Sequence, residues 1–151
     1  NISTEILTKW IYGINDNFWF DHLILIFQKE VADRIIADYN NSNYGRLSIL
    51  ANWKLIIKKI CDIKPSSFVP KPKVDSVFIK FKPIIGRNLD DPIADKLQII
   101  TRIAFMHRRK MIGKALQKLI SEDKLVELNI DLKSRAENLS VDDYVKIAMA
   151  L

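Results

Sequence analysis

The spacing of hydrophobic residues divides this chain into two parts. In the first part, segments with apolar residues three or four positions apart alternate with short apolar runs of strand length. The expected strands are 18–27, 53–60 and 74–81, and the expected helices lie between Ser3 and Gly13, over 31–39 and over 44–51. Because residues 23–27 are continuously apolar, we expect the first strand to be covered on both faces.

The alternation of helices and strands predicts an α/β sheet with helical cover over residues 1–86. Three strands are fewer than the roughly five or more that such sheets usually contain. The glycines Gly13, Gly45, Gly86 and Gly113 are scattered, so none belongs to a glycine-rich loop that could cradle a nucleotide. The first part is therefore predicted to be an incomplete α/β domain without its ligand-binding half.

Residues 87–151 show helical spacing throughout and predict a small all-helical domain. The polar stretch 86–91 is expected to be a linker, and Asp91 followed by Pro92 favours a new helix there. The buried stripe expected for that helix is Leu97, Ile100, Ile103 and Ala104. The remaining predicted helices are 111–120, 125–128 and 141–151.

Positive charge is concentrated in two blocks of a chain whose formal net charge is +6. Residues 54–82 carry eight lysines against two aspartates, and residues 101–120 carry six cations and no acid, so the rest of the chain is acidic. In the second block, Lys110, Lys114 and Lys118 recur every four residues, opposite the apolar side of the predicted helix. Clustered cations favour a nucleic-acid partner because they release its counterions, although either block alone fits a solvated surface equally well.

The stretch around Phe68 is the main candidate for chemistry. Three prolines surround it: Pro65, Pro70 and Pro72. Because proline fixes φ and biases the preceding residue toward extended geometry, Phe68 is expected in a stiff, non-helical segment. A rigid aromatic ring flanked by Lys71 and Lys73 suits stacking on a nucleobase. The alternative is a phenylalanine that packs the loop onto the core.

Composition restricts the other possibilities. Cys61 is the lone cysteine, which excludes an intrachain disulfide and a cysteine metal cluster and fits a reducing, cytoplasmic setting. His22 and His107 have no partner at ligand spacing, so no metal site is predicted. The longest apolar runs are far shorter than the ~20 residues of a membrane span, and no signal peptide is visible at Asn1. Because the chain opens without Met, we expect that an upstream segment has been removed.

Five separated strings resemble those of the bacterial ribosomal small-subunit RNA adenine dimethyltransferases, the family tied to kasugamycin sensitivity. They are Gln28-Lys-Glu-Val31, Tyr44-Gly-Arg-Leu-Ser48, Phe68-Val-Pro-Lys-Pro-Lys-Val-Asp-Ser76, Phe105-Met-His-Arg-Arg-Lys110 and Arg135-Ala-Glu-Asn-Leu-Ser140. Any one string is a weak signal. Five strings spread along the whole chain identify it as a member of this family.

The resemblance implies a Rossmann-like, S-adenosylmethionine-dependent methyltransferase domain, of which residues 1–86 are the last part, and a helical RNA-binding domain over 87–151. It implies N6-dimethylation of two adjacent adenines in small-subunit ribosomal RNA, on a pre-30S particle, by a cytoplasmic monomer. The family's catalytic motif, Asn-Leu/Ile-Pro-Tyr, normally stands immediately before the segment that begins here at Asn1. We therefore expect the cofactor site to lie mostly upstream and this chain to be inactive alone.

The resemblance also implies roles for individual residues. Phe68 is expected to stack on the target adenine. The expected RNA contacts are Arg108, Arg109, Lys110, Lys114, Lys118, Lys71 and Lys73. For Arg108 a salt bridge to the core is the alternative. Arg46 is expected to bond backbone carbonyls near the strands. The residues expected to form local caps or salt links are Arg135, Glu137 and Asn138, with Ser140 as the N-cap of the last helix.

Three other functions stay open at this point. Macrolide-resistance methyltransferases, which modify large-subunit RNA, share the type of motif found at 68–76 but typically lack the strings at 44–48 and 135–140. Residues 95–120 fit a helix-turn-helix that reads DNA, although the break between the helices lacks the expected glycine. The third possibility is a ribosome-assembly factor without chemistry.

Overall fold

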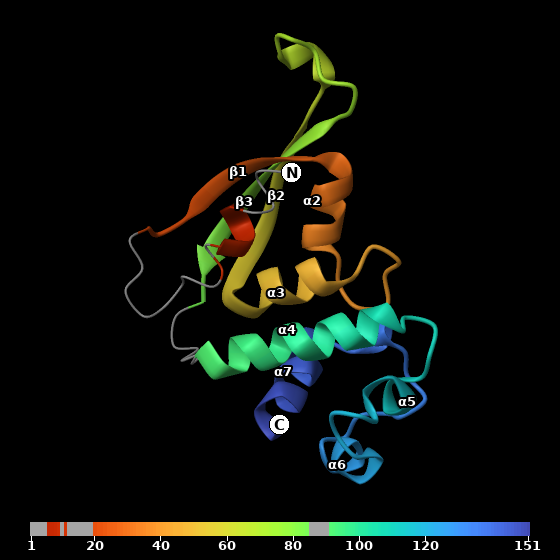
Figure 1. Cartoon of the computed structure of the whole chain (residues 1–151). Helices are drawn as coiled ribbons and strands as arrows, with labels where there is room; N and C mark the ends of the chain where they lie inside the picture. Colours follow the sequence, from red (N-terminus) through yellow and green to blue (C-terminus); the bar gives the residue numbers. More distant parts are fainter. Residues whose placement is uncertain (1–5, 10, 12–19, 85–90) are drawn as a thin grey trace.

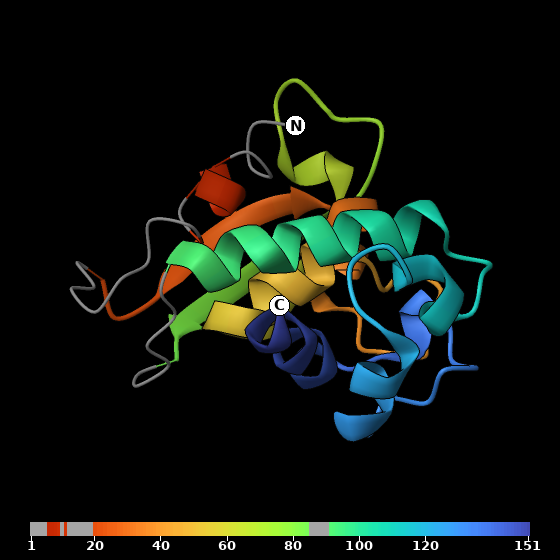
Figure 2. The ribbon, with the colours of Figure 1, turned by 60° about the horizontal axis from the view of Figure 1, so that its bottom comes forward.

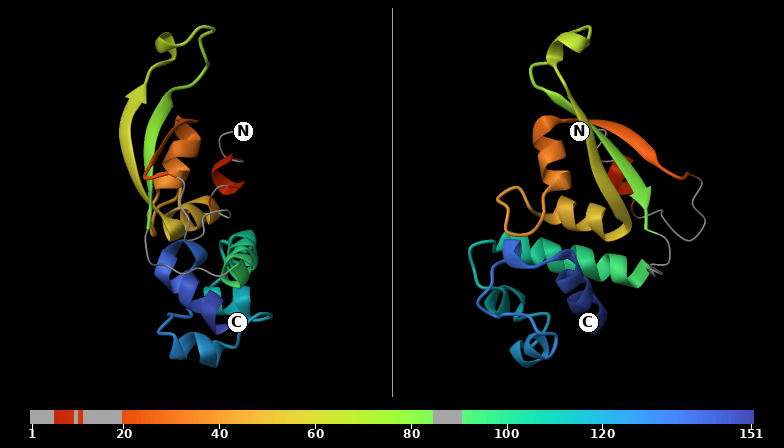
Figure 3. Two further views of the ribbon diagram at one scale, coloured as in Figure 1. Left: turned by 90° about the vertical axis from the view of Figure 1, so that its left-hand side faces the viewer. Right: turned by 180° about the vertical axis from the view of Figure 1, so that it is seen from behind.

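The computed structural model describes residues 6–9, 11, 20–84 and 91–151, and it places a three-stranded sheet beside a group of helices (Figure 1). The elements are β1 (Leu23–Gln28), α2 (Lys29–Ile36), α3 (Arg46–Lys54), β2 (Leu55–Ile63), the 3₁₀ turn η1 (Pro65–Ser67), β3 (Ser76–Pro83), α4 (Asp91–Met106), α5 (Ile112–Leu116), α6 (Glu122–Glu127), the 3₁₀ turn η2 (Ala136–Asn138) and α7 (Val141–Ala150). Helices α2 and α3 lie on one face of the sheet (Figure 3).

Strand β3 is the centre of the sheet and pairs antiparallel with both β1 and β2. Its residues Val77, Ile79 and Phe81 are fully buried against the helices, as the period-two alternation of the sequence predicted. The Phe81 ring meets the Phe27 ring of β1 edge to face, with 5.9 Å between the ring centroids. The sheet therefore buries one face through alternate residues of adjacent strands.

The prediction that the first strand is covered on both faces is wrong. Phe27 is buried, but Ile24 is 51% exposed and Ile26 is 39% exposed. Both faces of β1 carry apolar residues, so the sequence shows no alternation of apolar and polar positions, although the exposure of the residues alternates. Among the described residues, no helix covers that outer face (Figures 1 and 3).

Other boundaries shift by a few residues. The second strand begins at Leu55 because Trp53 and Lys54 complete α3. Helix α2 ends at Ile36, and Tyr39, which was expected on its buried face, is 46% exposed. The predicted cap at Ser3, the helix end at Gly13 and residues 86–90 of the linker predicted over 86–91 lie outside the described residues. Asp91 is the first residue of α4.

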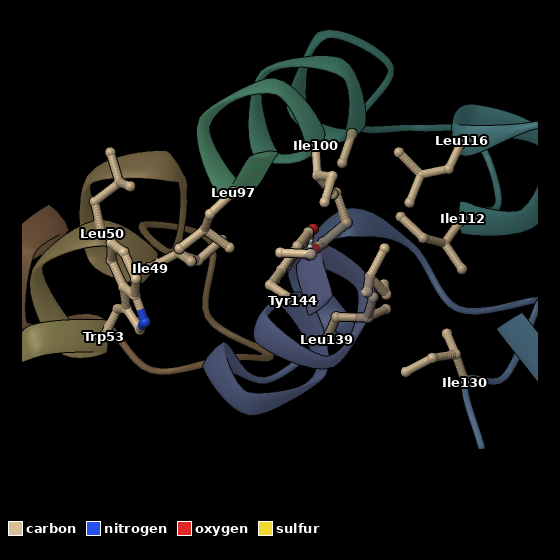
Figure 4. Packing of buried hydrophobic residues seen from close by; sticks show 14 of the residues in the cluster. Ile49, Leu50, Trp53, Leu97, Ile100, Ile112, Leu116, Ile130, Leu139 and Tyr144 are labelled. Carbon is tan, nitrogen blue, oxygen red and sulfur yellow. Dashed lines mark hydrogen bonds between the residues drawn. The ribbon is translucent and has the colours of Figure 1, made fainter. Parts of the chain in front are cut away.

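Helix α3 is buried on two sides. Ala51 packs with the sheet cluster that contains Phe27 and Phe81. Ile49, Leu50 and Trp53 belong to a second cluster, which joins α3 to α4, α5 and α7. Figure 4 shows Ile49 beside Leu97 of α4. Because one helix supplies residues to both clusters, the sheet and the helical part meet at α3. The domain boundary at 86/87 stays a prediction.

Polar residues of α3 fasten it to α2. The Ser48 hydroxyl accepts from the Gly45 N–H at 3.0 Å and donates to the Arg34 carbonyl at 2.5 Å. The Asn52 amide donates to the Ile35 carbonyl at 3.1 Å. Carbonyls in the last turn of a helix have no partner within that helix, so these two side chains satisfy groups of α2 that are otherwise left over.

The helical part is built around α4 and α7. Phe105 of α4 lies between Tyr44 and Tyr144, with ring centroids 6.2 Å away on each side. Burial raises the pKa of the Tyr144 hydroxyl, which donates to the Ala136 carbonyl at 2.8 Å. Burial, with smaller contributions from Asp38 and Asp143, also raises the pKa of Tyr44. These tyrosines therefore act as neutral core residues.

The predicted helix over 111–120 is shorter than expected. Helix α5 spans five residues, and Met111, expected to be buried, is 47% exposed. The Ile112 N–H bonds to the Ser134 carbonyl at 2.7 Å, so a distant segment fixes where α5 begins. The predicted class, an α/β part followed by helices, is confirmed. Within the described residues, no helix combines the length and apolar character that crossing a bilayer requires.

We expect Ser48→Ala to lower the free energy of unfolding by about 1–3 kcal/mol, because the Arg34 carbonyl and the Gly45 N–H each lose a partner in a region without free access to water. Thermal unfolding followed by circular dichroism measures the change. Ser66→Ala, in the exposed turn η1, is the control and should leave the midpoint unchanged. Equal midpoints for both variants would contradict the role of Ser48.

The cap of α7 predicts a pH dependence of stability. Burial raises the pKa of Asp143, but hydrogen bonds from Ser140 and Lys146 outweigh it and lower the pKa below its usual value. A depressed pKa in the folded state stabilises the fold above the unfolded-state pKa and loses that contribution as pH falls through the folded-state pKa. Asp143→Asn should cost about 1 kcal/mol at pH 7, and this difference should shrink at pH 3. A difference that is the same at both pH values would refute the assignment.

Candidate nucleic-acid interface

The loop between β2 and β3, residues 64–75, projects from the body of the molecule (Figures 1 and 3). Its two ends are held by the last pair of the ladder, Ile63 with Ser76. The Lys29 N–H at the start of α2 donates to the Asp75 carbonyl at 2.9 Å, which ties the end of the loop to a helix. The register of β2 shifts between Lys59 and Cys61, an irregularity of the kind that bends a strand. The loop is therefore presented on a supported hairpin.

Phe68 lies within this projecting loop. It follows η1, where its N–H donates to the Pro65 carbonyl at 3.2 Å, and its side chain is half-buried. Val69 beside it is fully exposed, and Lys71 and Lys73 are exposed. The ring is thus neither sealed in the core nor free of support. A partly supported ring among exposed lysines can receive an unpaired base on its open side.

The turn between α4 and α5 carries the second group of predicted residues. Its residues line an open hollow of about 500 Å³: Met106, His107, Arg108, Arg109 and Lys110. Arg109 and Lys110 are exposed, and their side chains form no ion pair or hydrogen bond within the described residues. Two uncompensated cations beside a hollow can bind phosphate groups.

Arg108 differs from its two neighbours because its guanidinium is already occupied. Its Nε donates to the Glu137 carboxylate at 2.7 Å, and its Nη2 donates to the Ser42 carbonyl at 2.7 Å. Arg108 thereby joins three segments: the end of α4, the loop before α3 and the turn η2. The alternative role, a salt bridge within the fold, is the one that the geometry displays, and an RNA contact by Arg108 stays a prediction.

The lysines that were expected to form one ladder lie in different settings. Lys114 pairs with Glu122 at 2.9 Å, so its charge is compensated. Lys118 lies in the turn after α5 and is exposed. The prediction that these lysines share one helix face assumed a helix over 111–120. Helix α5 has only five residues, so the lysines do not lie on one helix.

Phe68 and the Arg108–Lys110 turn are not brought together. The views from the front, the side and the back place the loop at the tip of the sheet and the turn at the side of the helical part, near α5 (Figures 1 and 3). The two groups therefore do not line one shared cleft. A single partner that touches both must extend along the molecule.

Two arginines that the sequence interpretation did not assign to binding lie in a third place. Arg46 is exposed and bonds no backbone carbonyl within the described part of the chain, contrary to the expectation. With Arg102 it lines an open hollow of about 320 Å³. The signal that could have found Arg102 is its place on α4, on the face opposite the buried Leu97 and Ile100.

The two histidines of the chain, His22 and His107, were not expected to bind a metal. Within the described ranges, no three potential metal ligands gather from His, Cys, Asp and Glu side chains. The expected structural roles of the last string are observed: the Asn138 amide oxygen accepts from the Arg135 N–H at 2.8 Å, and Ser140 caps α7.

Comparisons with known proteins show which family this chain resembles. The family model for ribosomal RNA adenine dimethylases matches residues 1–151. The ribosomal RNA small subunit methyltransferase A of Pelagibacter ubique (strain HTCC1062) is 55% identical over 150 residues, which are 97% of this chain and 56% of that protein. The chain therefore spans little more than half the length of this curated relative.

Solved structures share the fold. A crystal structure of a dimethyladenosine transferase from Plasmodium falciparum has a TM-score of 0.81 at 27% identity, covering 97% of this chain and 61% of the other. That of the 23S rRNA methyltransferase ErmE has a TM-score of 0.66 at 13% identity, covering 97% and 59%, which shows the fold alone. The family match over the whole chain confirms the resemblance of the five strings: the chain belongs to the ribosomal RNA adenine dimethylase family.

Proposed function

We propose that this chain is the RNA-facing part of an S-adenosylmethionine-dependent enzyme that dimethylates the N6 amines of two adjacent adenines in small-subunit ribosomal RNA. The observation that carries the proposal is the 55% identity, over nearly the whole chain, to a relative named as a small-subunit ribosomal RNA methyltransferase. The enzyme acts in the cytoplasm as a monomer, and its substrate is a pre-30S particle.

Phe68 is proposed to hold the target base. The amine of adenine is a poor nucleophile because its lone pair is delocalised into the ring, so the enzyme must extract the base and fix its orientation. The projecting loop gives Phe68 access to a base that has left its stack, and the fold beneath it limits its movement. Base stacking on an aromatic side chain contributes about 1–3 kcal/mol.

The acceptor groups that orient the amine are proposed to come from outside this chain. The sequence of residues 1–151 does not contain the string Asn-Leu-Pro-Tyr or Asn-Ile-Pro-Tyr. The relative from Pelagibacter ubique is long enough to hold such a motif beyond the matched part. Phe68 would then supply one side of the base site and the motif the other.

The residues described by the structure do not fit S-adenosylmethionine. Gly45 lies in the loop before α3, and Gly113 lies inside α5 against Leu132, so neither forms a strand-turn-helix loop that could cradle a nucleotide. We therefore place most of the cofactor site outside this chain and assign no chemical step of the cofactor to its residues.

RNA phosphates are proposed to bind the exposed cations. Among the predicted RNA contacts, those with no compensating partner among the described side chains are Arg109, Lys110, Lys118, Lys71 and Lys73. Arg108 and Lys114 are weaker candidates because Glu137 and Glu122 already hold them. The loop and the α4–α5 turn lie in different parts of the molecule, so an RNA that contacts both extends along it, as a ribosomal particle does (Figure 1).

The alternative functions are less well supported. A helix-turn-helix needs a recognition helix that lies in the major groove, and the five residues of α5 are too few. The likeness to a large-subunit enzyme, at 13% identity, concerns the fold. A direct test incubates the complete protein with S-adenosylmethionine and unmethylated 30S particles and measures N6-dimethyladenosine by mass spectrometry. Absence of this product would refute the proposal.

In the complete protein, Phe68→Ala should lower kcat/KM for methylation by roughly 5- to 150-fold, which corresponds to the loss of about 1–3 kcal/mol of stacking in the transition state. The dissociation constant of the RNA should change much less, because phosphate contacts dominate affinity. Val74→Ala, an exposed position in the same loop, is the matched control. Unchanged methylation by Phe68→Ala would remove the ring from the base site.

Replacing Arg109 and Lys110 together by Gln should weaken RNA binding and reduce the slope of log K against log salt by roughly 0.7–0.9 for each lost phosphate contact. Lys124→Gln, on α6, removes a cation elsewhere and should leave the slope unchanged. Arg108→Gln should instead lower the unfolding midpoint, because it breaks the link to Glu137 and Ser42. A slope that stays the same without Arg109 and Lys110 would rule out this surface.

A further inference from the structure

An open hollow lies between the start of α3 and the middle of α4, and none of its lining residues belongs to the two groups considered above. Its volume is about 320 Å³, and it is lined by Arg46, Asp95, Gln98, Ile99 and Arg102. Figure 2 shows α4 crossing the front of the molecule with α3 behind it, so this hollow lies at the surface of their contact. Arg46 is the first residue of α3, and the other four residues come from α4.

The hollow continues toward the turn at the end of α4. Asp95, Ile99, Arg102 and Met106 are exposed and follow one another at three- and four-residue intervals, so they form one solvent-facing stripe. Met106 is four residues beyond Arg102, roughly 6 Å along the helix axis, and it also lines the hollow of Lys110. The two hollows therefore lie next to each other along one face of α4.

The two guanidinium groups are not neutralised. Both arginines are exposed, and within the described ranges neither forms an ion pair or a side-chain hydrogen bond. Asp95 lines the same hollow, yet no oxygen of its carboxylate lies within ion-pair distance of either arginine. The formal charge of the hollow is thus +1, with two planar donor groups and the amide of Gln98 available.

We propose that Arg46 and Arg102 form a binding subsite for a backbone phosphate of the RNA substrate, continuous with the surface of Arg109 and Lys110. The inference rests on the proposed function. Guanidinium groups match the geometry of a phosphate through paired N–H donors, and Gln98 can donate to a third oxygen. Ile99 and Met106, 42% and 66% exposed, offer apolar contact to the sugars between successive phosphates.

This subsite extends the RNA path in a defined direction. The strand that touches Arg109 and Lys110 runs along α4 from its end toward its middle, to the start of α3. The Tyr44–Ser48 string thereby acquires a contact with RNA through Arg46, which is exposed in the hollow, whereas Tyr44 and Ser48 are buried.

The test uses the complete protein and a fragment of small-subunit ribosomal RNA. Replacing Arg46 and Arg102 together by Gln should weaken binding roughly tenfold at physiological salt and reduce the salt slope by about 0.7–0.9 for one lost phosphate. Lys133→Gln, an exposed cation in the loop after α6, should change neither quantity. Replacing both arginines by Lys should keep the salt slope while lowering affinity, because the charge remains and the paired donors do not.

Asp95→Asn separates binding from folding. Removing the carboxylate raises the charge of the hollow, so RNA should bind a few-fold more tightly, a gain that a damaged fold does not produce. Unchanged affinity of Asp95→Asn, together with an unchanged salt slope for the double Gln variant, overturns the subsite. Methylation of 30S particles by the unaltered protein keeps the proposed function standing in that case, whereas absence of RNA binding by the unaltered protein overturns both.

Discussion

The structure depends on helix α3 being buried on two sides. Ala51 faces the sheet, while Ile49 and Trp53 enter the core of the helical part, so one short helix has no apolar surface left for solvent. A helix buried on two sides has few positions for polar side chains. The polar side chains of Ser48 and Asn52 donate hydrogen bonds to carbonyls at the end of α2. Because protein interiors are close-packed, elements that pack on the two sides of α3 cannot easily shift relative to each other. The sheet and the helices are therefore held in one relative orientation.

This orientation explains how distant groups can act on one substrate. The hairpin loop with Phe68 is attached to the sheet, and the turn with Arg109 and Lys110 is attached to α4. Neither group touches the other, but both are fixed relative to α3. The body of the protein therefore fixes the separation at which an RNA can contact both the loop and the turn.

The strings that mark the family have separable physical roles. In the Tyr44–Ser48 string, Tyr44 packs in the core and Ser48 joins two helices. In the last string, Glu137 holds Arg108 and Asn138 closes a turn by accepting from the Arg135 N–H. These strings are chiefly structural. The string that contains Phe68 differs, because its loop projects and leaves Val69 fully exposed, which packing does not require.

The amino-acid sequence by itself determined the kinds of elements, the alternation of β3, the cap at Ser140 and, through its five strings, the family. These follow from local spacing and from side chains a few residues apart, which the chain displays directly. The tertiary structure decided the rest. Only packing showed that one face of β1 stays open, that Arg108 is bound by Glu137 and Ser42, and that Phe68 lies far from the basic turn. Contacts between residues such as Ser42 and Arg108, 66 positions apart, depend on how elements are stacked, and no local pattern in the sequence encodes that stacking.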